Sequence, residues 1–369
     1  MSEHDVRPRG LSRSLATPGR LGGIDLARAL AVFGMLTAHL TNTEALDIAR
    51  PETWSGIVDG RSSILFATLA GVSIALMSGG PRPVTGAARR DARARIAVRA
   101  GLIWTLGILL IAIGLPVYVI LPAYGILFVL SLPLLGWSAR WLFVLAAALA
   151  VTMPFVVAPI SFAAGEAATE GIGAALVGWW YPFPLWLAFL VAGMGVGRLD
   201  LRRVGVCAGL FGTGVVLAVF GYGAAAVLGL TEQHVFAIGP FTTAGAVAPH
   251  SGGLFEAIGS GGFALAVIGA CLLLCRIRVI DTVLWPLRAV GSMPLTIYVG
   301  QLLAWWMLAL ALGLPVGDLG GVRDAQPLCW FVLGSIVFAC AWRLFVGRGP
   351  LEWVLAQAAR VPELLRAAG

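Results

Sequence analysis

The sequence predicts an all-α protein that crosses a membrane many times. Of its 369 residues, 59% are hydrophobic and only 12% are charged. The mean hydropathy is +0.92, a value outside the range of ordinary soluble domains. Apolar runs of about 18 residues or more recur along the whole chain, each long enough to cross ~30 Å of hydrocarbon as a helix. The 48 glycines fit this class, because small residues let membrane helices approach closely.

We expect about ten transmembrane helices, one for each apolar run in chain order. Polar or glycine- and proline-containing segments separate the runs. The runs lie near residues 24–41, 60–78, 97–114, 118–136, 140–159, 183–198, 203–228, 254–275, 284–312 and 326–346. Because ten is an even number, both chain termini are expected on the same side of the membrane.

The loops between these runs alternate in charge, which indicates how the spans are oriented. Arginines precede the first span, fill residues 79–99, and recur after the fourth, sixth, eighth and tenth spans. The loops on the opposite side are acidic or neutral, apart from Arg50 and Arg323. Cytoplasmic loops of membrane proteins carry the excess of basic residues, so we predict that both termini are cytoplasmic.

The chain is predicted to form one membrane domain with two tails. Residues 1–20 are polar and arginine-rich, which is typical of a disordered basic tail, and residues 21–346 form the transmembrane domain. Residues 347–369 are amphipathic and are expected to lie on the cytoplasmic surface.

Composition argues against several other classes of function. The net charge of +7 comes from loop arginines rather than from mixed basic and aromatic patches, so no nucleic-acid partner is expected. All five cysteines fall inside apolar runs. Neither a disulfide framework nor a metal site is therefore predicted.

The first span contains three polar residues that are costly in lipid. Asp25 lies one turn before Arg28, and the two side chains can pair. His39 follows Arg28 by eleven residues, about three helical turns, so both project from nearly the same face and are separated by a rise of ~17 Å. A structural ion pair at the interface and a structural histidine would explain these residues, but their shared face favours a functional polar path.

A second polar cluster opens the next span, on the side where His39 emerges. Asp59, Arg61 and Ser62 stand together there. An aspartate beside a histidine can orient the ring and make it a better base, and an arginine can stabilise an oxyanion. Equally, Asp59 and Ser62 can cap the helix while Arg61 extends toward the membrane surface.

Two further groups of residues are candidates. His250 precedes the eighth span, on the same side as His39, and Glu256 follows it by six residues. The ninth span places Tyr298 and Gln301 inside an apolar helix that also contains Pro294. Such residues either bind a ligand or form hydrogen bonds between helices.

These motifs resemble a known superfamily of membrane acyltransferases. Asp25, Arg28 and His39 are spaced as in the first helix of the acyltransferase-3 family. The stretches "DGRSSILFATLAG" and "GSMPLTIYVGQ" are similar to the YeiB-like bacterial membrane proteins. The opening also resembles the membrane domain of heparan-α-glucosaminide N-acetyltransferase, whose reactive histidine lies in the loop after the first helix. That loop reads "RPETWSGIVDG" here and contains no histidine.

The resemblance implies a multi-pass acyltransferase of the bacterial inner membrane. It would move an acyl group, acetyl above all, from cytoplasmic acyl-CoA to a hydroxyl or amine of an envelope glycan or glycolipid. His39 would act as general base with Asp59 and Arg61, either directly or through an acyl-histidine. Asp25, Arg28, Tyr298 and Gln301 would bind the donor, and Ser62 and His250 the acceptor.

Two other functions fit the same residues. A transporter or flippase could use the polar path along the first helix to conduct a proton or a substrate, and a non-catalytic scaffold would need no path at all. Membrane lipid surrounds the protein in each case, and ten spans with short loops suit either a monomer or a homodimer.

Overall fold

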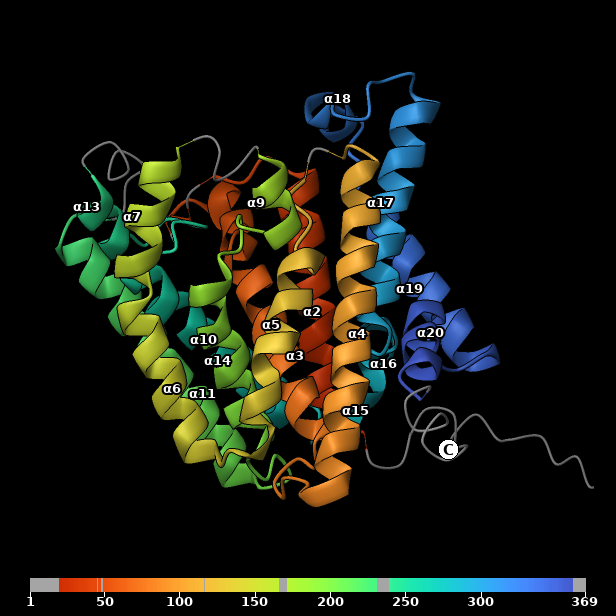
Figure 1. Cartoon of the computed structure of the whole chain (residues 1–369). Helices are drawn as coiled ribbons and strands as arrows, with labels where there is room; N and C mark the ends of the chain where they lie inside the picture. Colours follow the sequence, from red (N-terminus) through yellow and green to blue (C-terminus); the bar gives the residue numbers. More distant parts are fainter. Residues whose placement is uncertain are drawn as a thin grey trace, which may run out of the picture.

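The computed structural model describes residues 20–44, 46–47, 49–115, 117–165, 171–230 and 239–360. In these ranges all regular structure is helical, and the long helices lie side by side in one bundle (Figure 1). The predicted tail 1–20 falls outside the described residues except for its last residue, and so does the end of the predicted C-terminal tail, residues 361–369.

The helices divide into longer elements that make up the bundle and shorter elements that connect or flank them. The long ones are α2 (Gly22–Leu40), α3 (Arg61–Met77), α4 (Gly86–Ala112), α5 (Leu121–Ser131), α6 (Ala139–Thr152), α7 (Pro154–Ala164), α10 (Phe183–Gly197), α11 (Val204–Val227), α14 (Leu254–Leu274), α17 (Pro294–Ala311) and α19 (Leu328–Phe345). The short ones are η1 (Pro51–Val58), η2 (Leu132–Gly136), α9 (Ile172–Val177), α13 (Pro240–Gly245), α15 (Arg278–Val283), α16 (Trp285–Gly291), α18 (Leu319–Asp324) and α20 (Pro350–Ala358).

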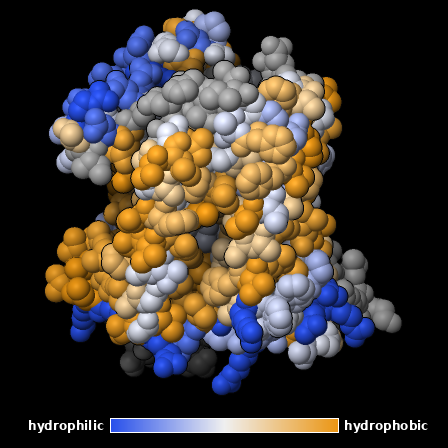
Figure 2. Space-filling model, turned by 90° about the vertical axis from the view of Figure 1, so that its left-hand side faces the viewer, coloured by the Kyte–Doolittle hydropathy of each residue, from blue (hydrophilic) through white to orange (hydrophobic). Residues whose placement is uncertain are grey.

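The protein is a polytopic helical membrane protein. Seven helices in the described part of the chain are long and apolar enough to span a membrane: η1 with α3, and α2, α4, α11, α14, α17 and α19. Each coincides with a predicted span. An eighth span forms if α6 and α7, which meet at a bend of 41°, are counted as one. Figure 2 shows the corresponding apolar band between two hydrophilic ends.

Two other predicted spans are short, and the ninth is interrupted. Residues 121–136 and 183–197 form apolar helices that are shorter than a typical span. The run at 284–312 is two helices, α16 and α17, which are separated at Ser292 and Met293. Pro294 begins α17 and accounts for the break, because proline lacks the N–H group that would continue the preceding helix.

Helix α4 begins well before its apolar run. Residues 86–96, predicted as part of an arginine-rich loop, form its first three turns. Hydropathy marks only the part of a helix that lies in lipid, whereas arginine and alanine are good helix formers on either side of that boundary. The helix therefore extends beyond the apolar band and carries Arg89, Arg93 and Arg95 with it.

Helix α2 occupies the centre of the bundle, where it packs against α3, α14, α16 and α17. Glycines permit the closest of these approaches. A Cβ atom at Gly291 of α16 would overlap the backbone carbonyl of Asp25 in α2, and one at Gly193 of α10 would overlap the carbonyl of Thr68 in α3. Small residues at such contacts let helices in lipid gain dispersion energy from close packing.

Candidate functional site

One face of α2 contributes residues to two cavities. Ile24 and Arg28 line a cavity at one end of the bundle, and Met35 and His39 line a second cavity at the other end. These residues recur at intervals of four, seven and four positions, so they share one face of the helix. The predicted alignment of Arg28 and His39 thus faces a cavity at each end.

The first cavity, which we name the arginine pocket, has a volume of about 680 Å³. Four arginines and two carboxylates line it, giving a formal net charge of +2 (four minus two): Arg20, Arg28, Arg99, Arg348, Asp25 and Glu352. Its deeper walls are apolar and come from α3, α4, α5 and α17. The pocket therefore combines a cationic entrance with an apolar interior.

Asp25 is the centre of an ion-pair network at this entrance. Its buried carboxylate accepts two hydrogen bonds from Arg20, at 2.9 and 2.7 Å, and one from Arg28 at 2.9 Å. Arg28 also donates to Ser73 Oγ of α3 at 2.6 Å. The predicted pairing of Asp25 with Arg28 is confirmed, and the network holds Arg28 in place at the pocket wall.

Helix α20 closes one side of the arginine pocket. Its Glu352 carboxylate accepts hydrogen bonds from the backbone N–H groups of Leu295 and Thr296, at 2.8 and 3.2 Å, and from Thr296 Oγ1 at 2.6 Å. A carboxylate is favoured there, because the first N–H groups of α17 have no partner within the helix. The part of the predicted amphipathic tail that the structure describes is thus fastened to the bundle.

The second cavity, which we name the histidine pocket, has a volume of about 230 Å³. It brings together four residues that the sequence analysis singled out, from three separate segments of the chain: His39, Asp59, Ser62 and His250. Tyr181 also lines it and donates to the carbonyl of Tyr118 at 3.1 Å. Burial raises the pKa of the Tyr181 hydroxyl, so this group stays protonated at neutral pH.

Asp59 pairs with His250 in this pocket, whereas the sequence suggested His39. The distance from His250 Nε2 to Asp59 Oδ1 is 3.8 Å. The Glu256 carboxylate holds the backbone around this histidine by accepting from the N–H groups of His250 and Gly252, both at 2.7 Å. His250 itself has a φ of 61°, a conformation that non-glycine residues adopt only when their surroundings require it.

His39 has a different environment. Its ring lies 6.2 Å from the ring of Trp305, between centroids, and its Nδ1 atom has no hydrogen-bond partner among the described residues. The carbonyl oxygens of Ala38 and His39 accept hydrogen bonds from Arg323 at 3.3 and 3.0 Å. A cation is stabilising at this end of a helix, which explains why Arg323 departs from the charge pattern of the loops.

Arg61 is not among the residues that line the histidine pocket. Its Nε donates to the Tyr222 hydroxyl at 2.7 Å, and its Nη1 donates to the Gly56 carbonyl at 3.0 Å. The guanidinium also lies 4.7 Å from the centre of the Tyr222 ring. These contacts join α3 to α11, so the geometry gives Arg61 a structural role, and Arg323 is the arginine that lines the pocket.

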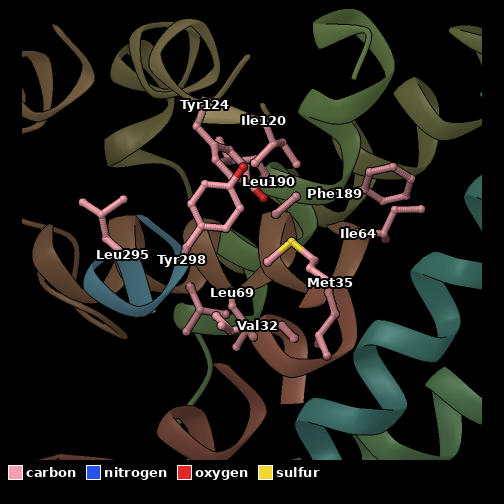
Figure 3. Packing of buried hydrophobic residues seen from close by; sticks show 14 of the residues in the cluster. Val32, Met35, Ile64, Leu69, Ile120, Tyr124, Phe189, Leu190, Leu295 and Tyr298 are labelled. Atoms are coloured by element: carbon pink, nitrogen blue, oxygen red, sulfur yellow. The ribbon is translucent and has the colours of Figure 1, made fainter. Parts of the chain in front are cut away.

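Tyr298 and Gln301, the predicted donor-binding residues of α17, line neither cavity. Tyr298 projects toward Tyr124 of α5, beside Ile120, and Val32 and Leu69 lie close to them (Figure 3). All five are buried and belong to the hydrophobic core. We name this cluster the septum; its Val32 lies on α2 between Arg28, which lines the first cavity, and Met35, which lines the second.

Three residues that hold the two cavities in shape escaped the sequence analysis or were given no role in it. Glu352 and Arg323 act on helices that are distant in the sequence, and Glu256 acts through backbone groups. Only Arg323 carried a signal, as a basic residue in an otherwise acidic or neutral loop. No group of three or more His, Cys, Asp or Glu side chains suited to a metal occurs in the described ranges.

Comparison with known proteins gives two matches that together extend over most of the chain. Residues 20–221 match the family model described as heparan-alpha-glucosaminide N-acetyltransferase, catalytic. Residues 213–361 match the family described as protein of unknown function (DUF418). No curated protein and no solved structure matches the chain. His39 and Asp59 lie in the first segment and His250 in the second, so the histidine pocket is built from both.

Proposed function

The chain belongs to the family of heparan-alpha-glucosaminide N-acetyltransferase catalytic domains, and on this premise we propose that it is a membrane acyltransferase. It transfers an acyl group, acetyl in the simplest case, from acyl-CoA on one side of the membrane to a hydroxyl or amine on the other. The observation that carries this proposal is the pair of cavities, one cationic and one containing two histidines, on a single stripe of α2.

The arginine pocket suits the phosphate-bearing end of acyl-CoA. Its net charge of +2 attracts a polyanion, and arginine is well adapted to bind phosphate oxygens in pairs. The Nε atom of Arg99 is buried without a partner among the described residues and is available to such a ligand. A volume of about 680 Å³ also lies within the usual range for small-molecule sites. By the charge rule this end is cytoplasmic, where the donor is available.

The histidine pocket supplies the general base, and we assign that role to His250. A catalytic histidine needs a group that holds its ring and stabilises its charged form. Asp59 is placed to do so for His250, while the Nδ1 of His39 has no partner in the described chain. His250 also stands beside the end of the loop that follows the first helix, and it thus supplies the imidazole which that loop lacks. We assign His39 the hydrogen bond to the thioester carbonyl.

The reaction then proceeds as a direct transfer. His250 accepts the proton of the acceptor O–H or N–H group while that oxygen or nitrogen attacks the thioester carbonyl carbon. The tetrahedral intermediate collapses, the C–S bond breaks, and the imidazolium returns its proton to the departing thiolate. The products are the acylated acceptor and CoA with a free thiol.

The acceptor approaches from the end of the bundle where the histidine pocket lies. With a volume of about 230 Å³, this pocket admits one functional group of a larger molecule rather than the whole molecule. Ser62, Tyr181 and His250 offer hydrogen bonds to a hydroxylated compound. We therefore propose an envelope glycan or glycolipid, on the outer side of a bacterial inner membrane, that presents one hydroxyl or amine. The family description makes an amino sugar the first acceptor to test.

Turnover of acetyl-CoA by purified protein, with glucosamine and glycolipid acceptors, tests this function. Wild-type protein is expected to release CoA only when an acceptor is present. His250→Gln and Asp59→Asn are each expected to lower kcat about 10²- to 10⁴-fold, the usual contribution of general base catalysis.

Glu52→Gln is the matched control, because Glu52 is an exposed residue of the same loop as Asp59. It should retain the wild-type kcat. Full activity of His250→Gln together with loss of activity in His39→Gln would transfer the role of base to His39. Absence of turnover with every acyl-CoA and acceptor would remove the enzymatic function.

A further inference from the structure

A third and smaller cavity, which we name the basic cleft, borders the arginine pocket. Three arginines and one carboxylate line it, so its formal net charge is +2 (three minus one): Arg20, Arg288, Arg343 and Asp25. Arg20, Asp25 and Ser292 line both cavities, whereas Arg288 of α16 and Arg343 of α19 line only the cleft. The two cavities thus meet at the Arg20–Asp25 ion pair, and the cleft has walls of its own.

The guanidinium of Arg288 is held at the wall of this cleft. Its Nη1 lies 2.6 Å from Asp281 Oδ2 and donates to the backbone carbonyl of Asp281 at 3.1 Å. Gly22, the first residue of α2, leaves room for this pair, because a Cβ atom there would lie 2.8 Å from Arg288 Nε and 2.9 Å from Asp281 Oδ1. The buried Nε has no hydrogen-bond partner among the described residues. Such a donor favours a ligand that brings acceptor oxygens into the cleft.

The positive charge of the cleft is not neutralised by the groups around it. Asp25 also pairs with Arg28, and Arg288 pairs with Asp281, so the wider set has four arginines and two carboxylates and keeps its formal charge of +2 (four minus two). Arg343 interacts electrostatically with Arg20 and Arg288 as well as with Asp25. Like charges repel strongly at the end of an apolar bundle. An anion that enters the cleft relieves this repulsion.

Exposed apolar side chains belong to the same segments that line the cleft. Helix α15 leads directly into α16, and its Val279 and Val283 are 72% and 69% exposed. Phe345 and Val346, which follow Arg343 at the end of α19, are 86% and 64% exposed. Helices α16 and α19 pack against each other at the edge of the bundle (Figure 1). Apolar side chains this exposed are stable beside lipid acyl chains, so these surroundings favour a lipid over a soluble anion.

We propose that the basic cleft binds the phosphate group of an anionic phospholipid. The guanidinium groups of Arg288 and Arg343 bind the phosphate oxygens, and the acyl chains lie along the exposed apolar side chains of α15 and α19. By the charge rule this end of the bundle is cytoplasmic, and the cytoplasmic leaflet carries anionic lipids. The lipid is a ligand distinct from the donor and the acceptor, and its site does not depend on the proposed function.

Native mass spectrometry of the full-length protein in detergent tests this inference. Titration with dioleoylphosphatidylglycerol should give a saturable complex, whereas dioleoylphosphatidylcholine, which has the same chains and no net charge, should bind much more weakly. Arg288→Gln and Arg343→Gln are each expected to weaken binding of the anionic lipid about fivefold, as for the loss of one arginine near an anionic headgroup. Arg343→Lys, which keeps the charge, should recover most of the affinity.

Three controls decide the outcome. Arg203→Gln, at an exposed position before α11, should bind the anionic lipid as wild type does. Glycerol 3-phosphate, a phosphate without acyl chains, should not compete with the lipid. Adenosine 3′,5′-bisphosphate should bind wild type and both cleft variants equally, because Arg288 and Arg343 do not line the arginine pocket.

Four results would overturn the lipid site. They are equal affinity of wild type for the two lipids, unchanged lipid affinity in Arg343→Gln, displacement of the lipid by glycerol 3-phosphate, and a parallel loss of bisphosphate binding in the cleft variants. The last result would make the cleft a part of the arginine pocket. If Arg288→Gln fails to fold because Asp281 loses its partner, the comparison of Arg343→Gln with Arg343→Lys decides.

Discussion

At the scale of single residues, arginines at helix C-termini stabilise the bundle. Arg198 donates to the carbonyl oxygens of Ala75, Ser78 and Gly80, which lie at and beyond the end of α3, at 3.0, 3.2 and 2.8 Å. Arg323 does the same for α2 at the opposite end of the molecule. The last carbonyls of a helix lack partners within it, and a cation satisfies them while favouring the helix dipole.

Replacing Arg198 should therefore destabilise the fold far more than replacing an exposed arginine. We expect Arg198→Leu to lower the free energy of unfolding by about 3 kcal/mol, because several buried carbonyls lose a charged donor at once. Thermal unfolding in detergent measures the difference. Arg202→Leu, a change at an exposed position four residues later, should have almost no effect. Equal melting temperatures for the two variants would contradict this role of Arg198.

The contact between Asp25 and Arg28 in the first helix could be predicted because the two residues are close together in the sequence. Asp25 and Arg28 are three residues apart, and helical geometry alone predicts their contact. His250 and Asp59 are 191 residues apart (250 minus 59), and only tertiary packing brings them together. The same limit applies to Arg61, whose partner Tyr222 lies on another helix. Local periodicity contains no information on either pairing.

At the scale of elements, the short helix α20 lies against both the start of α17 and the arginine pocket. Its Glu352 is bound to the start of α17, and Leu355 and Ala356 of the same helix line the arginine pocket. Pro294 cannot continue the preceding helix, so α17 begins at this residue. The first N–H groups of α17 then have no partner within the helix and are free to bind Glu352. The break in the ninth predicted span thus creates the site to which α20 is fastened.

Removing this carboxylate should release α20. We expect Glu352→Ala to lower the hydrogen-exchange protection of residues 350–358 about fivefold, the effect of losing a helix-capping interaction worth ~1 kcal/mol. Gln357→Ala, on the same helix, provides the control and should keep wild-type protection. Unchanged exchange in Glu352→Ala would show that other contacts hold α20.

Most spans were predictable, and the exceptions share a physical cause. Apolar runs mark the part of a helix in lipid, so α2, α3, α11 and α14 begin and end within about three residues of prediction. Hydropathy does not register the polar continuation of α4. A single proline lowers the mean hydropathy of a long apolar run only slightly. The run at 284–312 was therefore predicted as one span, and the break before α17 was not.

At the scale of the whole molecule, the two cavities lie at opposite ends of one apolar bundle. The described N-terminal residue, Arg20, and the C-terminal segment around Arg348 line the same cavity, so both ends of the described chain lie on one side. His39, His250 and Arg323 line the other. In the proposed reaction, the septum lies between donor and acceptor, and the acyl group crosses the bundle while the acceptor stays on its own side.

Transfer across a sealed membrane tests this account most directly. Proteoliposomes with the arginine pocket facing outward would receive labelled acetyl-CoA outside and an amino-sugar acceptor inside. The account predicts labelled acceptor in the lumen with wild-type protein, and almost none with His250→Gln. Label that appears only when donor and acceptor are placed on the same side of the membrane would contradict it.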